Sequence, residues 1–104
     1  MNKHPNEFTR RLIHNYFDKR KLEVVVNAVD QGYVIFFRHF SATEACNIND
    51  PSGRLLYDDF QDLWRLYWMS GHLRWHLYDR YPQISPALDE MLSEHAGDLF
   101  RKVL

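Results

Sequence analysis

The strongest constraint on the fold is a run of alternating large side chains on both sides of one short turn. Apolar and polar residues alternate over 62–69 and again over 73–80, and Ser70-Gly71-His72 lies between the two runs. Alternation with period two is typical of β-strands, and a glycine-containing turn between two such runs is typical of a hairpin. The sequence therefore predicts an antiparallel sheet that contains this hairpin.

The two faces of the predicted hairpin differ in chemistry. Successive strand side chains point to opposite sides, and a two- or four-residue turn would bring the apolar sets of both strands onto one face. We expect this face to lie in the core, and it comprises Trp64, Leu66, Trp68, Leu73, Trp75 and Leu77. The other face alternates cations with rings and comprises Arg65, Tyr67, Arg74, His76, Tyr78 and Arg80.

This second set of residues is the candidate ligand-binding surface. Guanidinium groups bind phosphate and carboxylate in bidentate fashion, and tyrosine rings stack on bases, so such a surface could hold nucleic acid or another anionic ligand. Cross-strand packing between arginine and tyrosine is the structural alternative. The charge of the segment is also balanced by nearby acids, namely Asp58, Asp59, Asp62 and Asp79. The sequence leaves both interpretations open.

The first half of the chain predicts one helix and further strands. Apolar residues at helical spacing predict an amphipathic helix over 7–20, with Asn6 as its N-cap; they are Phe8, Leu12, Ile13, Tyr16 and Phe17. Runs rich in β-branched and aromatic residues predict a hairpin of strands 23–29 and 33–40. Asn, Asp, Pro, Ser and Gly dominate 41–53 and predict a loop, and 54–58 follows as a short strand.

The C-terminal part of the chain predicts a second helix. Ser85 is a suitable N-cap and Pro86 a suitable first helical residue. The apolar stripe of this helix comprises Ala87, Leu88, Met91 and Leu92, with a continuation through Leu99, Phe100 and Val103. The predicted fold class is therefore α+β, with an N-terminal amphipathic helix packed on an antiparallel sheet of four to five strands, in the order α-β-β-β-β-β-α, in a single domain over 1–104.

Composition and charge exclude several classes of function. The chain has 13 basic and 14 acidic residues, which is not the balance of a dedicated nucleic-acid binder. Residues 1–22 are locally basic, because they hold six basic and two acidic residues, including the cluster Arg10, Arg11, Lys19, Arg20 and Lys21. No apolar stretch approaches the ~20 residues of a membrane helix, and the chain begins without a secretion leader. We expect a cytoplasmic protein without a membrane partner.

Metal-binding and catalytic patterns are not visible in the sequence. The six histidines lack a His-x-x-x-His spacing on a helix, and His72 and His76 would lie about 13 Å apart along a strand. Cys46 is the single cysteine and has no neighbouring cation to activate it. We therefore predict no catalytic residue, no metal and no cofactor, and an enzyme is the less favoured class.

The two runs of the hairpin resemble a known family signature. Leu63-Trp64-Arg65-Leu66-Tyr67-Trp68-Met69 and Leu73-Arg74-Trp75-His76-Leu77-Tyr78-Asp79 are similar to the Trp-x-Leu-Tyr-Trp-Met … Leu-Lys-Trp-His-x-Tyr-Glu-Pro pattern of a bacterial family, domain of unknown function 3024. The similarity covers roughly residues 8–82. The resemblance implies a bacterial cytoplasmic protein, and it transfers no catalytic residue.

The aromatic content suggests what the protein does. Aromatic residues make up 15 % of the chain, more than a core of this size must bury, and exposed rings are typical of interaction surfaces. We expect the core to hold Phe8, Tyr16, Phe17, Trp64, Trp68 and Trp75. The leading hypothesis is a non-enzymatic interaction or accessory module that binds a protein partner or a second copy of itself. Weak binding of nucleic acid or an anionic ligand on the 62–80 hairpin is the alternative.

Overall fold

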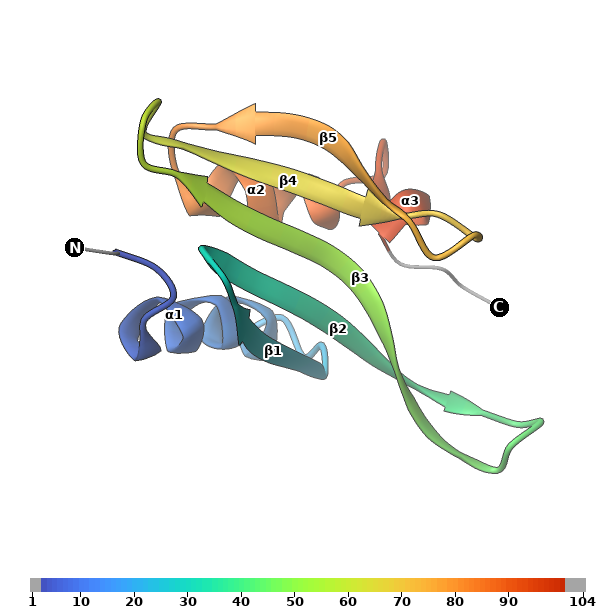
Figure 1. Cartoon of the computed structure of the whole chain (residues 1–104). Helices are drawn as coiled ribbons and strands as arrows, with labels where there is room; N and C mark the ends of the chain where they lie inside the picture. The colour runs from blue at the N-terminus through green and yellow to red at the C-terminus, as the bar shows by residue number, and fades with distance from the viewer. Residues whose placement is uncertain (1–2, 101–104) are drawn as a thin grey trace.

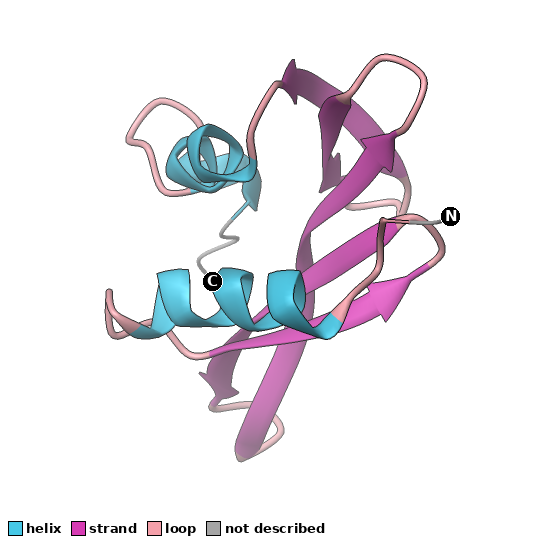
Figure 2. Cartoon of the chain, turned by 90° about the vertical axis from the view of Figure 1, so that its left-hand side faces the viewer, coloured by secondary structure: helices cyan, strands magenta, loops and turns pink. Residues whose placement is uncertain are grey.

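The structure, a computed structural model, describes residues 3–100 and confirms the predicted α+β class. One antiparallel sheet contains five strands in chain order: β1 (Val24–Val29), β2 (Gly32–Ser41), β3 (Cys46–Asp58), β4 (Leu63–Met69) and β5 (Trp75–Tyr81) (Figure 1). The helices are α1 (Glu7–Asp18), α2 (Ile84–Met91) and α3 (Gly97–Phe100). All three lie on the same side of the sheet (Figure 2), so one sheet face is covered and the other is open.

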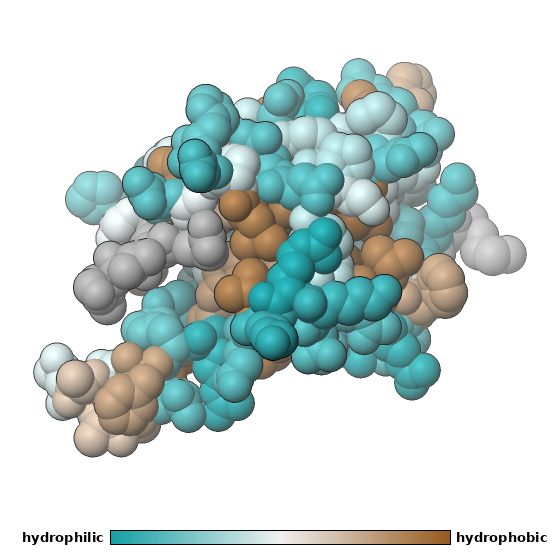
Figure 3. All heavy atoms as spheres, turned by 180° about the vertical axis from the view of Figure 1, so that it is seen from behind, coloured by the Kyte–Doolittle hydropathy of each residue, from teal (hydrophilic) through white to brown (hydrophobic). Residues whose placement is uncertain are grey.

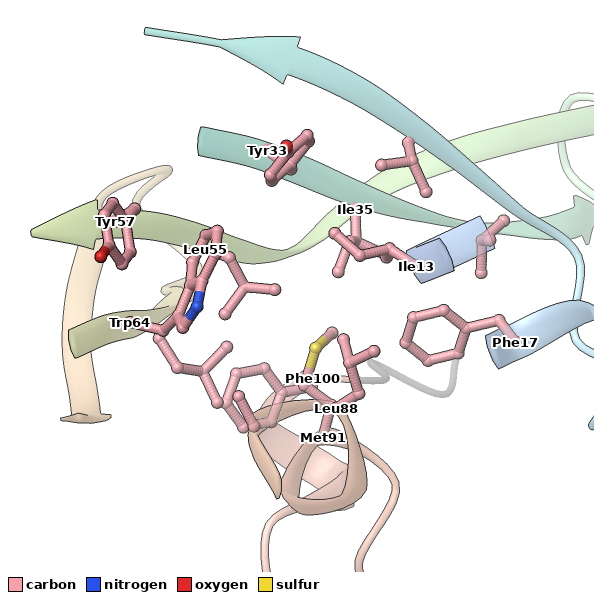
Figure 4. Packing of buried hydrophobic residues seen from close by; sticks show 14 of the residues in the cluster. Ile13, Phe17, Tyr33, Ile35, Leu55, Tyr57, Trp64, Leu88, Met91 and Phe100 are labelled. Carbon is pink, nitrogen blue, oxygen red and sulfur yellow. The ribbon is translucent and has the colours of Figure 1, made fainter. Parts of the chain in front are cut away.

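The core lies between the covered face of the sheet and the helices (Figure 4). Alternate residues of the three central strands point into it, among them Tyr33, Ile35, Leu55, Tyr57, Trp64 and Leu66. The helices supply Ile13, Phe17, Leu88, Met91 and Phe100. Burial of these side chains stabilises the fold, at about 25 cal/mol for each Å² of apolar surface removed from water.

The apolar stripe of α1 differs from the prediction. Thr9, Ile13 and Phe17 face the core at four-residue spacing, whereas Phe8 is 79 % exposed and Leu12 is 40 % exposed. The placement of Phe8 in the core was therefore wrong. An α-helix turns 100° per residue, so residues four apart lie almost on one line along its surface. α1 contacts the sheet along the line of Thr9, Ile13 and Phe17, and its other apolar residues lie beside this line.

The two ends of α1 follow from local hydrogen bonds. Asn6 is the N-cap as predicted, because its Oδ1 accepts a hydrogen bond of 2.7 Å from the Thr9 backbone N–H. The helix ends at Asp18 rather than at residue 20. Lys21 adopts a φ of 60°, and the Leu22 N–H donates to the Phe17 carbonyl, which closes the last turn.

The prediction of a loop over 41–53 was wrong, because only 42–45 form the turn and β3 begins at Cys46. Along 46–53, β3 pairs with β2 alone, since its pairing with β4 starts at Arg54. The result is a two-stranded arm that projects from the body of the protein (Figure 1). Pro51 needs no hydrogen-bond partner on the free side of such a strand, and the pairing is shifted beside it, so residues that favour turns are tolerated here.

The C-terminal helix starts earlier than predicted. Gln83, not Ser85, takes the N-cap position, so Pro86 is the third helical residue, where its missing N–H still costs no intrahelical bond. The predicted apolar stripe is confirmed in α2 by the burial of Ala87, Leu88 and Met91. Phe100 is buried in α3, and Val103 lies outside the described residues. No helix in the described range 3–100 has the length and apolarity to span a membrane.

Candidate functional site

The turn between β4 and β5 determines which side chains share a face. Met69 lies opposite Trp75, so the connection is 70–74, an odd number of residues. With an odd number of connecting residues, each side chain of β5 points to the sheet face opposite to the one that an even number would give. As a result Trp75 and Leu77 lie on the open face, opposite Met69 and Tyr67, and their predicted place in the core was wrong.

A β-bulge in β5 shifts the pairing by one residue, so the side chains beyond it point to the faces that the sequence predicted. Leu66 lies opposite Asp79 while Tyr67 lies opposite Leu77, so Tyr78 is the extra residue. Beyond the bulge Arg80 lies directly opposite Arg65, as the predicted faces require. The bulge therefore divides β5 into two parts of opposite orientation.

The predicted set of six site residues does not form one surface. Arg65, Tyr67 and Arg80 share the open face, and Arg74 lies in the exposed turn. His76 and Tyr78 lie on the covered side instead. The prediction that all six face the same way was wrong, because it assumed an even turn and an unbroken strand.

The two side chains on the covered side each contact an aromatic ring. The His76 ring stacks on Trp68 with 4.8 Å between ring centroids. The Tyr78 ring lies 5.3 Å from Phe100, and its hydroxyl donates a 2.7 Å hydrogen bond to Glu90 in α2. This hydrogen bond is the main reason that the pKa of Tyr78 rises to about 12. Tyr78 therefore connects the sheet to α2 rather than facing a ligand.

Arg54 joins the three residues that remain on the open face. It lies directly opposite Tyr67 in the pairing of β3 with β4, and its guanidinium carbon is 5.7 Å from the centre of the Tyr67 ring. We call Arg54, Arg65, Tyr67 and Arg80 the arginine face. It spans β3, β4 and β5 on the side that carries no helix (Figure 1).

The charges of the arginine face are only partly compensated. Arg65 forms a 2.5 Å ion pair with Asp58. Backbone hydrogen bonds from Gln61 and Phe60, together with Arg65, lower the pKa of the Asp58 carboxyl. Among the described residues, no ion pair involves Arg54 or Arg80. The face therefore carries a net positive charge.

A second exposed surface lies on the other side of the molecule, beside α1. A groove of about 580 Å³ is lined by Phe8, Arg11, Leu12, Asn15, Tyr16, Lys19, Arg20 and Ser85, and we call it the α1 groove. Figure 3 shows this helix-bearing side, where hydrophobic surface lies in a hollow bordered by hydrophilic side chains. Three of the eight lining residues are cations, and none is a carboxylate.

Comparison with known protein families identifies the family of this chain. A family model described as a domain of unknown function, DUF3024, matches residues 1–101. The chain belongs to the DUF3024 family. Neither a curated protein nor a solved structure matches it. The predicted family is thereby confirmed, and no activity comes with it.

Over residues 3–100 no three His, Cys, Asp or Glu side chains are grouped so as to hold a metal ion. Cys46 is exposed in the projecting arm. Among the described residues, the arginine face and the α1 groove each gather three cations beside an aromatic ring.

Sequence reasoning missed two features of the DUF3024 chain that have a sequence signal. Leu55 and Tyr57 are core residues, so the alternation of a strand places Arg54 with Leu56 on the opposite face. The exposure of Phe8 and Leu12 follows from Thr9, Ile13 and Phe17, which form the better-centred helical stripe. In both cases the sequence pattern allows more than one orientation, and only the burial of the neighbouring residues decides between them.

Proposed function

We propose that this DUF3024 protein is a non-enzymatic interaction module that binds an acidic, partly apolar segment of a partner protein in the α1 groove. The observation that carries this proposal is the exposure of Phe8 and Leu12, one helical turn apart, beside a basic rim. Apolar side chains that lie together on a surface mark interaction sites, and aromatic side chains are enriched where proteins bind one another.

The charge of the groove indicates which partner fits. Lys19 and Arg20 form no ion pair with any described residue, and Arg20 lies 3.6 Å from the centre of the Tyr16 ring. Glu7 compensates Arg11 in part, through an ion pair of 3.2 Å. A partner with carboxylates around an apolar side chain would complement both the basic rim and the apolar floor.

The groove is also held in a defined shape. The Tyr16 hydroxyl donates a hydrogen bond to Asp89, which joins α1 to α2 across 73 residues of sequence. Burial and this hydrogen bond raise the pKa of Tyr16 to about 12, so the contact persists at neutral pH. A groove that is formed before binding loses less entropy when the partner docks.

Binding of a designed acidic peptide tests the proposal. The probe is a fluorescein-labelled helical peptide with leucines on one face and glutamates elsewhere, measured by anisotropy against a peptide with the same residues in scrambled order. We expect Phe8→Asp to weaken binding at least tenfold, because it removes the apolar anchor and adds a repelled charge. Phe60→Asp is the matched control, since Phe60 is 99 % exposed in the β3–β4 turn and is no part of the groove.

Two results would overturn this function. One is equal affinity of the peptide for the Phe8→Asp and Phe60→Asp variants. The other is a native mass of two chains by light scattering that falls to one chain only with Phe8→Asp. In that case a second copy of the chain, not an acidic partner, would occupy the groove.

A further inference from the structure

The arginine face is separate from the α1 groove, since the helices and the arginine face lie on opposite sides of the sheet. We propose that the arginine face binds single-stranded nucleic acid, with its arginines on phosphates and Tyr67 against a base. This site is independent of the proposed function, so either can fail without the other.

Two like charges face each other across neighbouring strands of the arginine face. Arg65 and Arg80 are direct cross-strand partners, an arrangement that destabilises a sheet. Asp58 offsets Arg65, but the same carboxylate also accepts hydrogen bonds from Phe60 and Gln61, and Arg80 has no acidic partner among residues 3–100. A bound phosphate between the two guanidinium groups would remove the repulsion.

The spacing of the cations suits a chain of phosphates. Arg54 of β3 lies opposite Tyr67 of β4. Arg80 of β5 lies opposite Arg65, which precedes Tyr67 by two residues in β4. Strand spacings of about 4.8 Å and a rise of about 3.3 Å per residue put the two backbones roughly 12 Å apart. At this separation the two arginines can each contact a different phosphate of one nucleic-acid backbone.

The apolar residues of the same face distinguish nucleic acid from other polyanions. Tyr67 lies between Arg54 and Leu77, and Trp75 follows two residues from Leu77 on the same face. All of these side chains are partly or largely exposed, and no helix covers them. Aromatic rings stack on unpaired bases, which an acidic peptide or a sulfated sugar does not offer.

The test uses the full chain and a fluorescein-labelled 12-nucleotide oligothymidylate, with anisotropy measured at several salt concentrations. We expect Arg54→Gln combined with Arg80→Gln to weaken binding at least tenfold. Loss of two phosphate contacts should also reduce the slope of log K against log salt by about 1.4. Lys19→Gln combined with Arg20→Gln removes the same charge from the α1 groove, and this control should stay within twofold of the unmodified protein.

Tyr67→Leu separates base recognition from general attraction to charge. We expect it to weaken oligothymidylate binding at least fivefold and to leave heparin binding unchanged. The proposal is overturned if Tyr67→Leu binds the oligonucleotide normally, or if the Arg54/Arg80 and Lys19/Arg20 double variants weaken binding equally. If Arg54→Gln lowers the thermal midpoint, Arg80→Gln alone decides the outcome, because Arg80 is exposed; unchanged binding would then contradict the proposal.

Discussion

The two sides of the sheet are made by the same strands and have opposite chemistry. On β4, Trp64 and Leu66 are buried on the side of the sheet that carries the helices, while Arg65 and Tyr67, their immediate neighbours in sequence, lie on the open face. Period-two alternation makes this division possible. Stability therefore depends mainly on the covered side, and the open side can carry charges that cost stability.

The largest contrast is expected between two leucines of the same hairpin. Leu66→Ala removes a fully buried side chain of the covered side and should lower the free energy of unfolding by about 2–5 kcal/mol. Leu77→Ala, on the open face and 41 % exposed, should cost less than about 1 kcal/mol. Urea denaturation of both variants measures the difference, and equal losses would break the comparison.

A smaller effect is expected from the hydrogen bond that joins the covered side to α2. Tyr78→Phe removes the hydroxyl that donates to Glu90 and should cost about 0.5–1.5 kcal/mol at neutral pH. Tyr67→Phe on the open face is the matched control and should be close to neutral. Thermal unfolding monitored by circular dichroism compares the two.

The same tyrosine gives a prediction at alkaline pH. The pKa of Tyr78 is raised to about 12 in the folded chain, above the ordinary value of 10. The folded state then holds its proton more tightly than the unfolded state, so stability falls as pH rises from about 10 to 12. Tyr78→Phe should make this decline shallower, and an unchanged decline would contradict the role of the hydroxyl.

A further effect is expected on the covered side of the sheet, in the segment that precedes α1. His4 lies there against Tyr33, Tyr57 and Trp64, with ring centroids 4.5–5.8 Å apart, and its Nδ1 is 2.8 Å from the Tyr33 hydroxyl. Burial lowers the pKa of His4 below 6.5. The unfolded chain therefore binds the proton first, and stability should fall as pH drops below about 6.5.

Substitution of the histidine checks this assignment. His4→Phe keeps an aromatic ring in place but cannot be protonated, so the loss of stability between pH 7 and 5 should become smaller. His72→Phe, in the exposed turn between β4 and β5, is the control. If both variants retain the full acid dependence in thermal unfolding, His4 is not its source.

The smallest effect should have the opposite sign. Arg80→Thr removes the cation that faces Arg65 and should stabilise the fold by about 0.2–1 kcal/mol. The same substitution should weaken oligonucleotide binding. A destabilised Arg80→Thr variant would show that the open face contributes to stability, and the division between the two sides would have to be abandoned.

Much of the fold could be predicted because its signals are local. The periodicity of α1, the two hairpins and the stripe of α2 depend on residues close in sequence, and Asn6 caps its helix with its own side chain. The strand over 46–53 could not be predicted in this way. Its residues favour turns, and only the pairing with β2 makes it extended.

The candidate site was predicted less well, because its geometry depends on two details of pairing. An odd turn at 70–74 and one extra residue at Tyr78 each invert the faces of β5. Neither feature can be recognised from the alternation of apolar and polar residues in the sequence. The odd turn moved His76 and Tyr78 to the other face, and the bulge returned Arg80 to the predicted one.

The sequence by itself determined the fold class, the family and the presence of cations and rings in the β4–β5 hairpin. The tertiary structure alone decided that Arg54 joins Arg65, Tyr67 and Arg80, and that Phe8 and Leu12 remain exposed. The physical reason is that a side chain's direction depends on the register of its strand or on the contact line of its helix. Register and contact are set by partners distant in the chain, which local pattern does not record.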